Sequence, residues 1–257
     1  MFQQSSGDSN ESLVENMCNS NLITHPLVES AFKVDRSQYA PREPYKDSPQ
    51  LLSHQATISA PHMHAKAVNS LLPFLLPKDE IVGVKGRPRR VLDIGSGSGF
   101  LVHVFAELVG ETGVVVGVDH IEELRNLGET NMRKSDEGIE LLNSGRVHFR
   151  LGDGRKGWSG QSSTDADKED GWDAIHVGAG AIRLHDELVR QLRSPGRLFI
   201  PVAEEESWFS DQYIWTVDKD EKGNVTKTKH YSAKYVWLMG APEGPLGASV
   251  EDSSERL

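Results

Sequence analysis

Five apolar segments rich in β-branched residues alternate with segments of helical periodicity, and this alternation constrains the fold more than any other feature of the chain. The apolar segments are RVLDIG (90–95), VVVGVD (114–119), RVHFRLGDG (146–154), WDAIHVGAG (172–180) and GRLFIPV (196–202). Continuous apolar strands separated by helices are typical of a parallel sheet that is covered on both faces. The pattern therefore predicts an α/β fold with a doubly wound, mostly parallel sheet.

The flanking segments extend this core into one predicted domain over residues 11–239. We divide it into N-terminal helices with a long irregular loop, an α/β core, and strands that add an antiparallel edge, at 11–60, 61–202 and 203–239. Three other segments are rich in glycine, proline, serine or charge and lack periodicity, which favours disorder or exposed loops. We expect a disordered tip, a surface insertion and a flexible tail at 1–10, 159–170 and 240–257. Helical spacing within the core predicts helices at 100–109, 121–134 and 184–192.

Composition excludes several kinds of partner. The 257 residues carry 38 acidic and 28 basic side chains, a net charge of -10, so the average field repels nucleic acid. The chain has no apolar run near the roughly 20 residues that a membrane span needs. Cys18 is the single cysteine, and the N-terminal residues lack the features of a secretory or transit signal. We expect a cytoplasmic protein with no membrane association.

The segment VLDIGSGSGF (91–100) joins a buried strand to a helix through three glycines. Such a loop lets a ligand approach the backbone, and the helix beyond it offers free N–H groups. A dinucleotide site needs a third glycine where Phe100 stands, and Asp93 precedes Gly95 and Gly97 at the strand tip. Because a carboxylate repels phosphates but suits a cationic ligand, the loop favours S-adenosylmethionine over NAD or ATP.

Two more carboxylates end the strands that follow. Asp119 stands where a ribose would lie, and Asp153, next to Gly152, stands where it could hold an adenine amino group. The carboxyl ends of parallel strands open on one crevice, so the three acids are expected to line one site. Taken singly, Asp93 or Asp119 could instead cap the helix that follows it.

The segment QATISAPHMHAK (55–66) allows three interpretations. A metal site is disfavoured because His62 and His64 lie two residues apart with no cluster of partners, and we expect no bound metal. A serine nucleophile is also disfavoured, since Ser59 lacks the G-x-S-x-G elbow. The third interpretation is a helix start at Pro61, capped by Ser59 or Thr57, with the histidines as hydrogen-bonding residues. His62 has no assigned role.

These segments, with YAPREPYKDSPQ, GVDHIEEL and LRSPGRLFIPV in the same order, resemble the protein-L-isoaspartate (D-aspartate) O-methyltransferase family over roughly residues 11–202. The resemblance implies a class I, Rossmann-like, S-adenosylmethionine-dependent methyltransferase. Its members methylate the α-carboxylate of isoaspartyl residues in damaged peptides and proteins, which starts their repair. The small, exposed substrates suggest a monomer.

The resemblance also implies site residues. The family's active-site serine falls on Ser59, which we interpret as a positioning residue because the substrate carboxylate is already ionised. The implied cofactor contacts, together with the acid and glycines of the loop, are Ala56, Thr57, Ile58, Ser59, His64, Asp93, Gly95, Gly97, Ser98, Asp119, His120, Gly152 and Asp153.

The resemblance fades after Pro201. The family has a threonine and a glutamine near VWLMGAPEGP, but Met239 and Gly240 occupy that region, so neither contact is carried over. Two other hypotheses remain open: a class I methyltransferase with a different carboxylate or protein substrate, and a cofactor-binding protein that has lost turnover. The intact Ser59, Asp93, Asp119 and Asp153 argue against the second of these.

Overall fold

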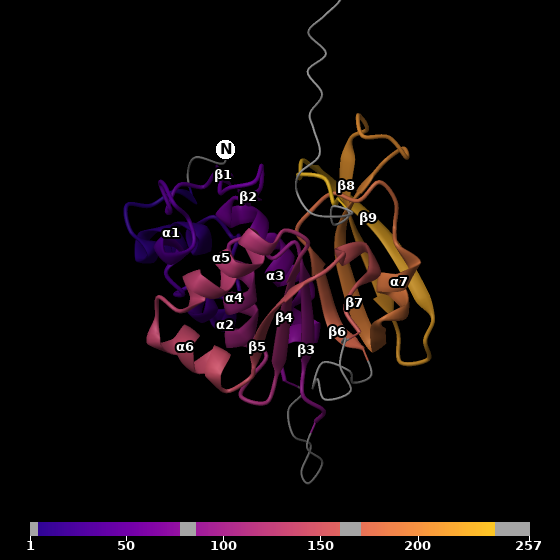
Figure 1. The fold of residues 1–257 in the computed structure, drawn as a ribbon, viewed down its shortest axis with the longest axis horizontal. Helices are drawn as coiled ribbons and strands as arrows, with labels where there is room; N and C mark the ends of the chain where they lie inside the picture. The colour runs from indigo at the N-terminus through magenta and orange to yellow at the C-terminus, as the bar shows by residue number, and fades with distance from the viewer. Residues whose placement is uncertain (1–4, 78–85, 160–170, 240–257) are drawn as a thin grey trace, which may run out of the picture.

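The computed structural model describes residues 5–77, 86–159 and 171–239, and a seven-stranded sheet forms its centre (Figure 1). The strand order is β5-β4-β3-β6-β7-β8-β9. The strands are β3 (Arg90–Ile94), β4 (Val114–Asp119), β5 (Val147–Leu151), β6 (Trp172–Val177), β7 (Leu192–Ala203), β8 (Gln212–Lys219) and β9 (Val225–Ala233).

The first five strands of this sheet are parallel, and the last two are antiparallel additions at one edge. The chain passes from β3 outward through β4 to β5, and then returns to build β6 and β7 on the other side of β3. A ligand crevice forms where the strand order reverses in this way, at the carboxyl ends of the strands. The predicted fold class is confirmed, including its antiparallel C-terminal edge.

Helices cover the sheet and also form a layer beside it. They are α1 (Asn10–Asn19), α2 (Pro26–Ala31), α3 (Pro61–Leu75), α4 (Phe100–Leu108), α5 (Glu122–Met132), α6 (Asp136–Asn143) and α7 (Asp186–Arg190), with 3-10 turns η2 (Arg36–Gln38) and η3 (Gly154–Lys156). A small hairpin, β1 (Gln50–Leu51) and β2 (Thr57–Ile58), precedes α3. Figure 1 shows α1 and α2 at the opposite end of the molecule from β8 and β9.

Alternate residues of the central strands enter two separate cores. Val91 of β3 packs with α1 to α4, whereas its neighbour Leu92 packs on the other face with Leu188 of α7 and Trp172 of β6. Side chains of successive strand residues point to opposite faces, so a strand buried on both sides must be apolar throughout. This is why the sequence reads as continuous apolar runs, and the two cores fix the strand tips that form the site.

The structure corrects several expected boundaries. Helix α6 was not expected, and the helix expected at 184–192 is only Asp186–Arg190. It ends early because the carbonyl of Gln191 accepts a hydrogen bond from Trp172 N, and β7 begins at Leu192 beside β6. The other two expected helices, 100–109 and 121–134, are Phe100–Leu108 and Glu122–Met132.

The disordered tip expected at 1–10 is wrong for residues 5–10. Ser5 is buried, Gly7 N donates to Tyr45 O, and Ser9 caps α1, which begins at Asn10. The insertion expected at 159–170 lies outside the described residues except for Ser159, and the tail at 240–257 lies outside them entirely. No helix in the described part of the chain is long and apolar enough to cross a membrane.

Candidate functional site

The glycine loop between β3 and α4 uses backbone conformations that favour glycine. Gly95, Gly97 and Gly99 have φ values of 73°, 49° and 84°. A side chain at Gly99 would place its Cβ 2.9 Å from the carbonyl oxygen of Gly128 in α5. The loop therefore packs its backbone directly against α5, and only glycine permits this approach.

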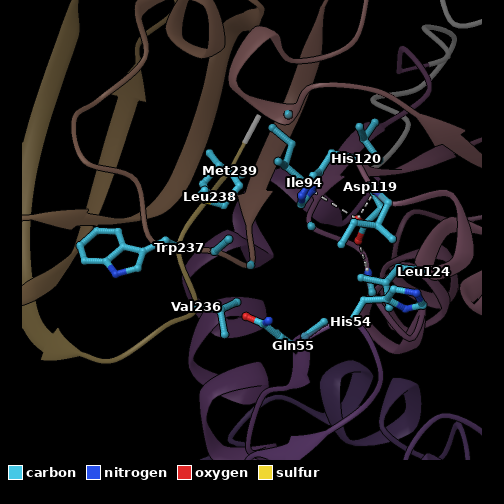
Figure 2. Close-up of a pocket in the computed structure, with 18 of the residues that line it drawn as sticks. His54, Gln55, Ile94, Asp119, His120, Leu124, Val236, Trp237, Leu238 and Met239 are labelled. Carbon is cyan, nitrogen blue, oxygen red and sulfur yellow. Dashed lines mark hydrogen bonds and ion pairs between the residues drawn. The ribbon is translucent and has the colours of Figure 1, made fainter. Parts of the chain in front are cut away.

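A cavity of about 590 Å³ opens at the carboxyl ends of the strands, beside this loop. Figure 2 shows side chains from the β1–β2 hairpin, the strand tips and the end of the described chain around it. Its volume lies within the roughly 300–1,000 Å³ typical of small-molecule sites. Of the predicted residues, those that line it are Ala56, Thr57, Gly95, Gly97, Asp119 and His120.

Asp119, at the tip of β4, links the glycine loop to the next helix. Its Oδ2 accepts from Gly97 N and its Oδ1 from Ile121 N, both at 3.1 Å, while His120 Nδ1 lies 3.6 Å from Oδ1. Burial raises the pKa of this carboxyl, and the backbone hydrogen bonds partly oppose that rise. The carboxylate thus shapes the cavity wall and also faces the cavity.

A second, much smaller cavity of about 30 Å³ adjoins the first and shares Thr57, Gly95, Gly97 and Gly178 with it. Five further predicted residues line it: Ile58, Ser59, His64, Asp93 and Ser98. The structure therefore brings the predicted serine and the glycine loop to one place, although they are about 40 residues apart in the sequence.

Asp93 lies at the small cavity with its carboxylate already paired. His176 Nδ1 lies 2.6 Å from Asp93 Oδ1, and both side chains are buried. The rings of His176 and Phe199 are stacked, which holds the histidine in place. The expected direct role of Asp93 toward a cationic ligand stays a prediction, and His176 is a site residue that the sequence reasoning missed.

The predicted pair Gly152 and Asp153 lies beside the main cavity and lines neither of the two. Asp153 Oδ2 lies 2.7 Å from Arg155 Nη2, and Oδ1 accepts from Arg155 N at 3.0 Å. The hydrogen bond from the Arg155 side chain lowers the pKa of Asp153. Asp153 starts η3, and Gly154 is the residue of this turn that lines the cavity. An adenine contact by Asp153 stays a prediction.

His62 anchors a loop and lines neither cavity. Its backbone N and its Nδ1 lie 3.0 and 2.8 Å from Oδ1 of Asp47, whose side chain is fully buried. The pair ties the irregular loop before β1 to the first turn of α3. His62 is thus a hydrogen-bonding residue at the helix start, as the third interpretation of its segment predicts. The cap by Ser59 or Thr57 in that interpretation is wrong, because the N-cap residue of α3 is Ala60 and no side chain caps the helix.

Several residues of the main cavity were not predicted from the sequence, and they include two groups at the ends of strands and of the described chain. Gly178 and Ala179 follow β6, and the rule that sites gather at strand tips could have found them. The segment 236–239 had no comparable signal. It runs beside Gly180, which donates to Val236 O and accepts from Leu238 N, both at 2.7 Å, and so it closes one side of the cavity.

Within the described residues, no three metal-ligating side chains are grouped to hold an ion.

The sheet order and the cavity at its switch point define a doubly wound, Rossmann-like protein with a site for a small-molecule ligand. Residues 8–243 match the family model described as protein-L-isoaspartate(D-aspartate) O-methyltransferase (PCMT). The chain therefore belongs to this family, and the resemblance seen in the sequence motifs is confirmed.

Individual relatives agree with this assignment. A protein-L-isoaspartate O-methyltransferase of Caenorhabditis elegans is 38% identical over 220 residues, which cover 85% of this chain and 88% of the relative. Protein-L-isoaspartate O-methyltransferase 1 of Arabidopsis thaliana is 37% identical, with 92% and 94% covered. A crystal structure from Plasmodium falciparum, assigned to the same kind of enzyme and in complex with S-adenosyl-L-homocysteine, matches with a TM-score of 0.74 and 28% identity. That match covers 91% of this chain and 99% of the other.

Proposed function

We propose that this chain transfers a methyl group from S-adenosylmethionine to the α-carboxylate of L-isoaspartyl, and D-aspartyl, residues in damaged proteins. One observation carries the proposal: Ser59 lines a small cavity that shares four residues with the large cavity beside the glycine loop. A methyl donor held in the large cavity and a carboxylate held at Ser59 would meet at this junction. Family membership supports the same substrate class.

The residues of the large cavity fit the proposed cofactor. Asp119 offers a buried carboxylate for hydroxyl groups, while Ile94, Val118 and Leu124 supply apolar walls for a flat base. The backbone at Gly95 and Gly97 permits close approach. When bound, S-adenosylmethionine supplies a methyl group that is already reactive because it is attached to a sulfonium.

The protein then has little chemistry to perform beyond alignment. A substrate carboxylate, with a reference pKa near ~4, is ionised at neutral pH and needs no general base. Ser59 can donate a hydrogen bond that holds this carboxylate in line with the methyl group. Closing the site against water strengthens such a contact and lowers competing hydrolysis. Ser59 is therefore proposed as a positioning residue.

The test uses tritium-labelled S-adenosylmethionine and an isoaspartyl peptide. We expect label in the peptide that mild alkali releases as methanol, because a carboxyl methyl ester hydrolyses and an N-methyl group does not. Ser59→Ala should lower kcat/KM by roughly 10-fold, as expected for one lost charge-assisted hydrogen bond. Its affinity for the cofactor should change much less. Alkali-stable label, or no label, would contradict the proposal.

A methyltransferase with another carboxylate or protein substrate is the alternative. The family model extends to residue 243, beyond the end at residue 202 that the motifs indicated. The alternative therefore rests on Val236–Met239, which help to line the cavity and carry none of the family motifs quoted above. The alternative predicts ester formation on other proteins and none on isoaspartyl peptides.

We further propose that the protein works as a monomer in the cytoplasm. The small size of an exposed isoaspartyl segment supports the first point, and the single cysteine supports the second. Light scattering of the purified protein and fractionation of the cells that express it test the two points.

A further inference from the structure

Arg36, in the 3-10 turn η2, places a buried guanidinium behind the small cavity. Its side chain is only 1% exposed. Its Nη2 donates to the carbonyl oxygen of Ser59 at 2.7 Å, and its Nη1 lies 3.1 Å from His64 Nδ1. Its Cζ also lies 5.1 Å from the ring centroid of Phe100, the first residue of α4. One side chain thus contacts the serine segment, the site histidine and the helix of the glycine loop.

This contact determines which nitrogen of His64 carries the proton. Burial lowers the pKa of Arg36 to about 9, so the guanidinium stays protonated at neutral pH and can only donate. His64 Nδ1 must therefore accept. Burial and the nearby Arg36 charge hold the pKa of His64 well below its usual range, so the ring is neutral. A neutral ring that accepts at Nδ1 has its single N–H at Nε2.

The ring itself is held in place by packing. His64 stacks on Phe100 with centroids 5.3 Å apart, so Arg36 and His64 both lie against the same ring. The backbone of Arg36 is fixed in turn, because its N–H donates to Asn10 Oδ1 of α1 at 3.3 Å. The N-terminal helical layer thereby reaches the site through one residue.

The guanidinium has neutral partners. Within the described residues it forms no ion pair, and Asp47 is the acid whose charge acts on it from further away. In the described part of the chain its side-chain hydrogen bonds go to a carbonyl and an imidazole, and Phe100 adds an aromatic face. Burying a cation among neutral groups costs stability, since buried charges are ordinarily paired with charges. This points to a role at the site.

We propose that Arg36 is a positioning residue of the methyl-transfer site, which holds the Ser59 backbone in place and keeps His64 in the Nε2–H form. The catalytic consequence rests on the proposed function, whereas the state of His64 does not.

Nitrogen NMR of protein labelled with ¹⁵N-histidine tests the state of His64 without any substrate. The His64 signal is assigned by its loss in His64→Gln. We expect Nδ1 to show the shift of an unprotonated nitrogen and Nε2 that of an N–H nitrogen at neutral pH. Arg36→Met removes both donors. In this variant the Nδ1 and Nε2 shifts of His64 should move toward those of a mixture of the two neutral tautomers. A proton on Nδ1 in the wild type, or unchanged Nδ1 and Nε2 shifts in Arg36→Met, would overturn the proposal.

Arg146→Met is the matched control. Arg146 is partly buried and, like Arg36, donates to backbone: its Nη2 lies 2.9 and 2.7 Å from the carbonyl oxygens of Ala106 and Gly110, at the far end of α4 from the glycine loop. It should alter melting temperature without changing the His64 signals or kcat/KM. Changes in the His64 signals of this variant as large as those in Arg36→Met would show that loss of any arginine that donates to backbone carbonyls disturbs the site, which contradicts a specific role.

Kinetics with an isoaspartyl peptide give the second readout. Arg36→Met should lower kcat/KM by roughly 10- to 100-fold, the scale of a misplaced reacting group. Arg36→Lys, which can reach only one of the two acceptors, should recover part of kcat. Wild-type kcat/KM in Arg36→Met at a temperature where it is folded would overturn the proposal. If the wild type fails to methylate the peptide, the proposed function falls, and the NMR result still decides the role of Arg36.

Discussion

At the residue scale, single side chains do more than the motif patterns indicate. Asp119 was predicted from its place at a strand tip, and the structure adds that its two oxygens hold the backbone of Gly97 and Ile121. The sequence could not show these bonds, because they depend on the turn that the glycines make. Nothing in the sequence indicated that Arg36 lies at the site, since a lone arginine in an irregular segment is ordinarily a surface residue.

Replacing Asp119 with asparagine tests the hydrogen bonds that its two carboxylate oxygens accept. Asp119→Asn keeps one acceptor and turns the other into a donor that faces a backbone N–H. We expect cofactor affinity to fall by roughly 10-fold or more, since a hydrogen bond to a charged group contributes about 1.5–3 kcal/mol. Asp153→Asn is the comparison, because Arg155 already occupies that carboxylate. Calorimetric titration with S-adenosylhomocysteine measures both, and equal losses would show that Asp153 contributes as much as Asp119.

The lowered pKa of His64 makes stability depend on pH. The unfolded chain takes up a proton near pH 6.5 at this residue, and the folded chain does so only at a much lower pH. The stabilising contribution is therefore complete above pH 6.5 and is lost as the pH falls below it. In urea titrations below pH 6.5, the free energy of unfolding should fall with decreasing pH in both proteins. The fall should be steeper in the wild type than in His64→Gln, by up to about 1.4 kcal/mol per pH unit. Parallel curves for the two proteins would contradict a depressed pKa.

At the element scale, the strands and their order followed from hydrophobic patterning, whereas short elements did not. Continuous apolar runs between helices leave few alternatives to a parallel sheet. Helix α6 and the short α7 were misjudged because propensity over eight or fewer residues is a weak guide, and tertiary contacts such as Gln191 O to Trp172 N decide where they end.

The glycine loop offers a matched pair of substitutions. Gly97→Ala and Gly99→Ala both force alanine into a left-handed conformation, which costs about 1–2 kcal/mol. At Gly99 the new Cβ also meets the backbone of Gly128 at 2.9 Å, while at Gly97 the nearest atom is Leu52 Cδ1 at 3.6 Å. We expect Gly99→Ala to lose about 1–3 kcal/mol more stability, since that contact requires α5 to shift. Thermal or urea unfolding measures the difference, and equal losses would contradict the close packing of loop and helix.

At the scale of the whole molecule, the sequence predicted the fold class, and the family motifs predicted residues that the structure brings to the two adjoining cavities. What it could not predict was the contribution of distant segments. Val236–Met239 reach the cavity only because the chain returns from β9 to lie beside Gly180, and η2 reaches Ser59 only because the N-terminal helices pack on α3 and α4. Such contacts depend on how the finished layers meet, and they leave no local pattern.

The central claim is that this assembled site selects isoaspartyl carboxylates. Its most direct test compares methyl transfer to two peptides of identical composition, one with an isoaspartyl residue and one with a normal aspartyl residue at the same position. We expect a kcat/KM that is at least about 100-fold higher for the isoaspartyl peptide, a difference of roughly 2.7 kcal/mol in transition-state binding. Equal transfer to the two peptides, or transfer to neither, would contradict it.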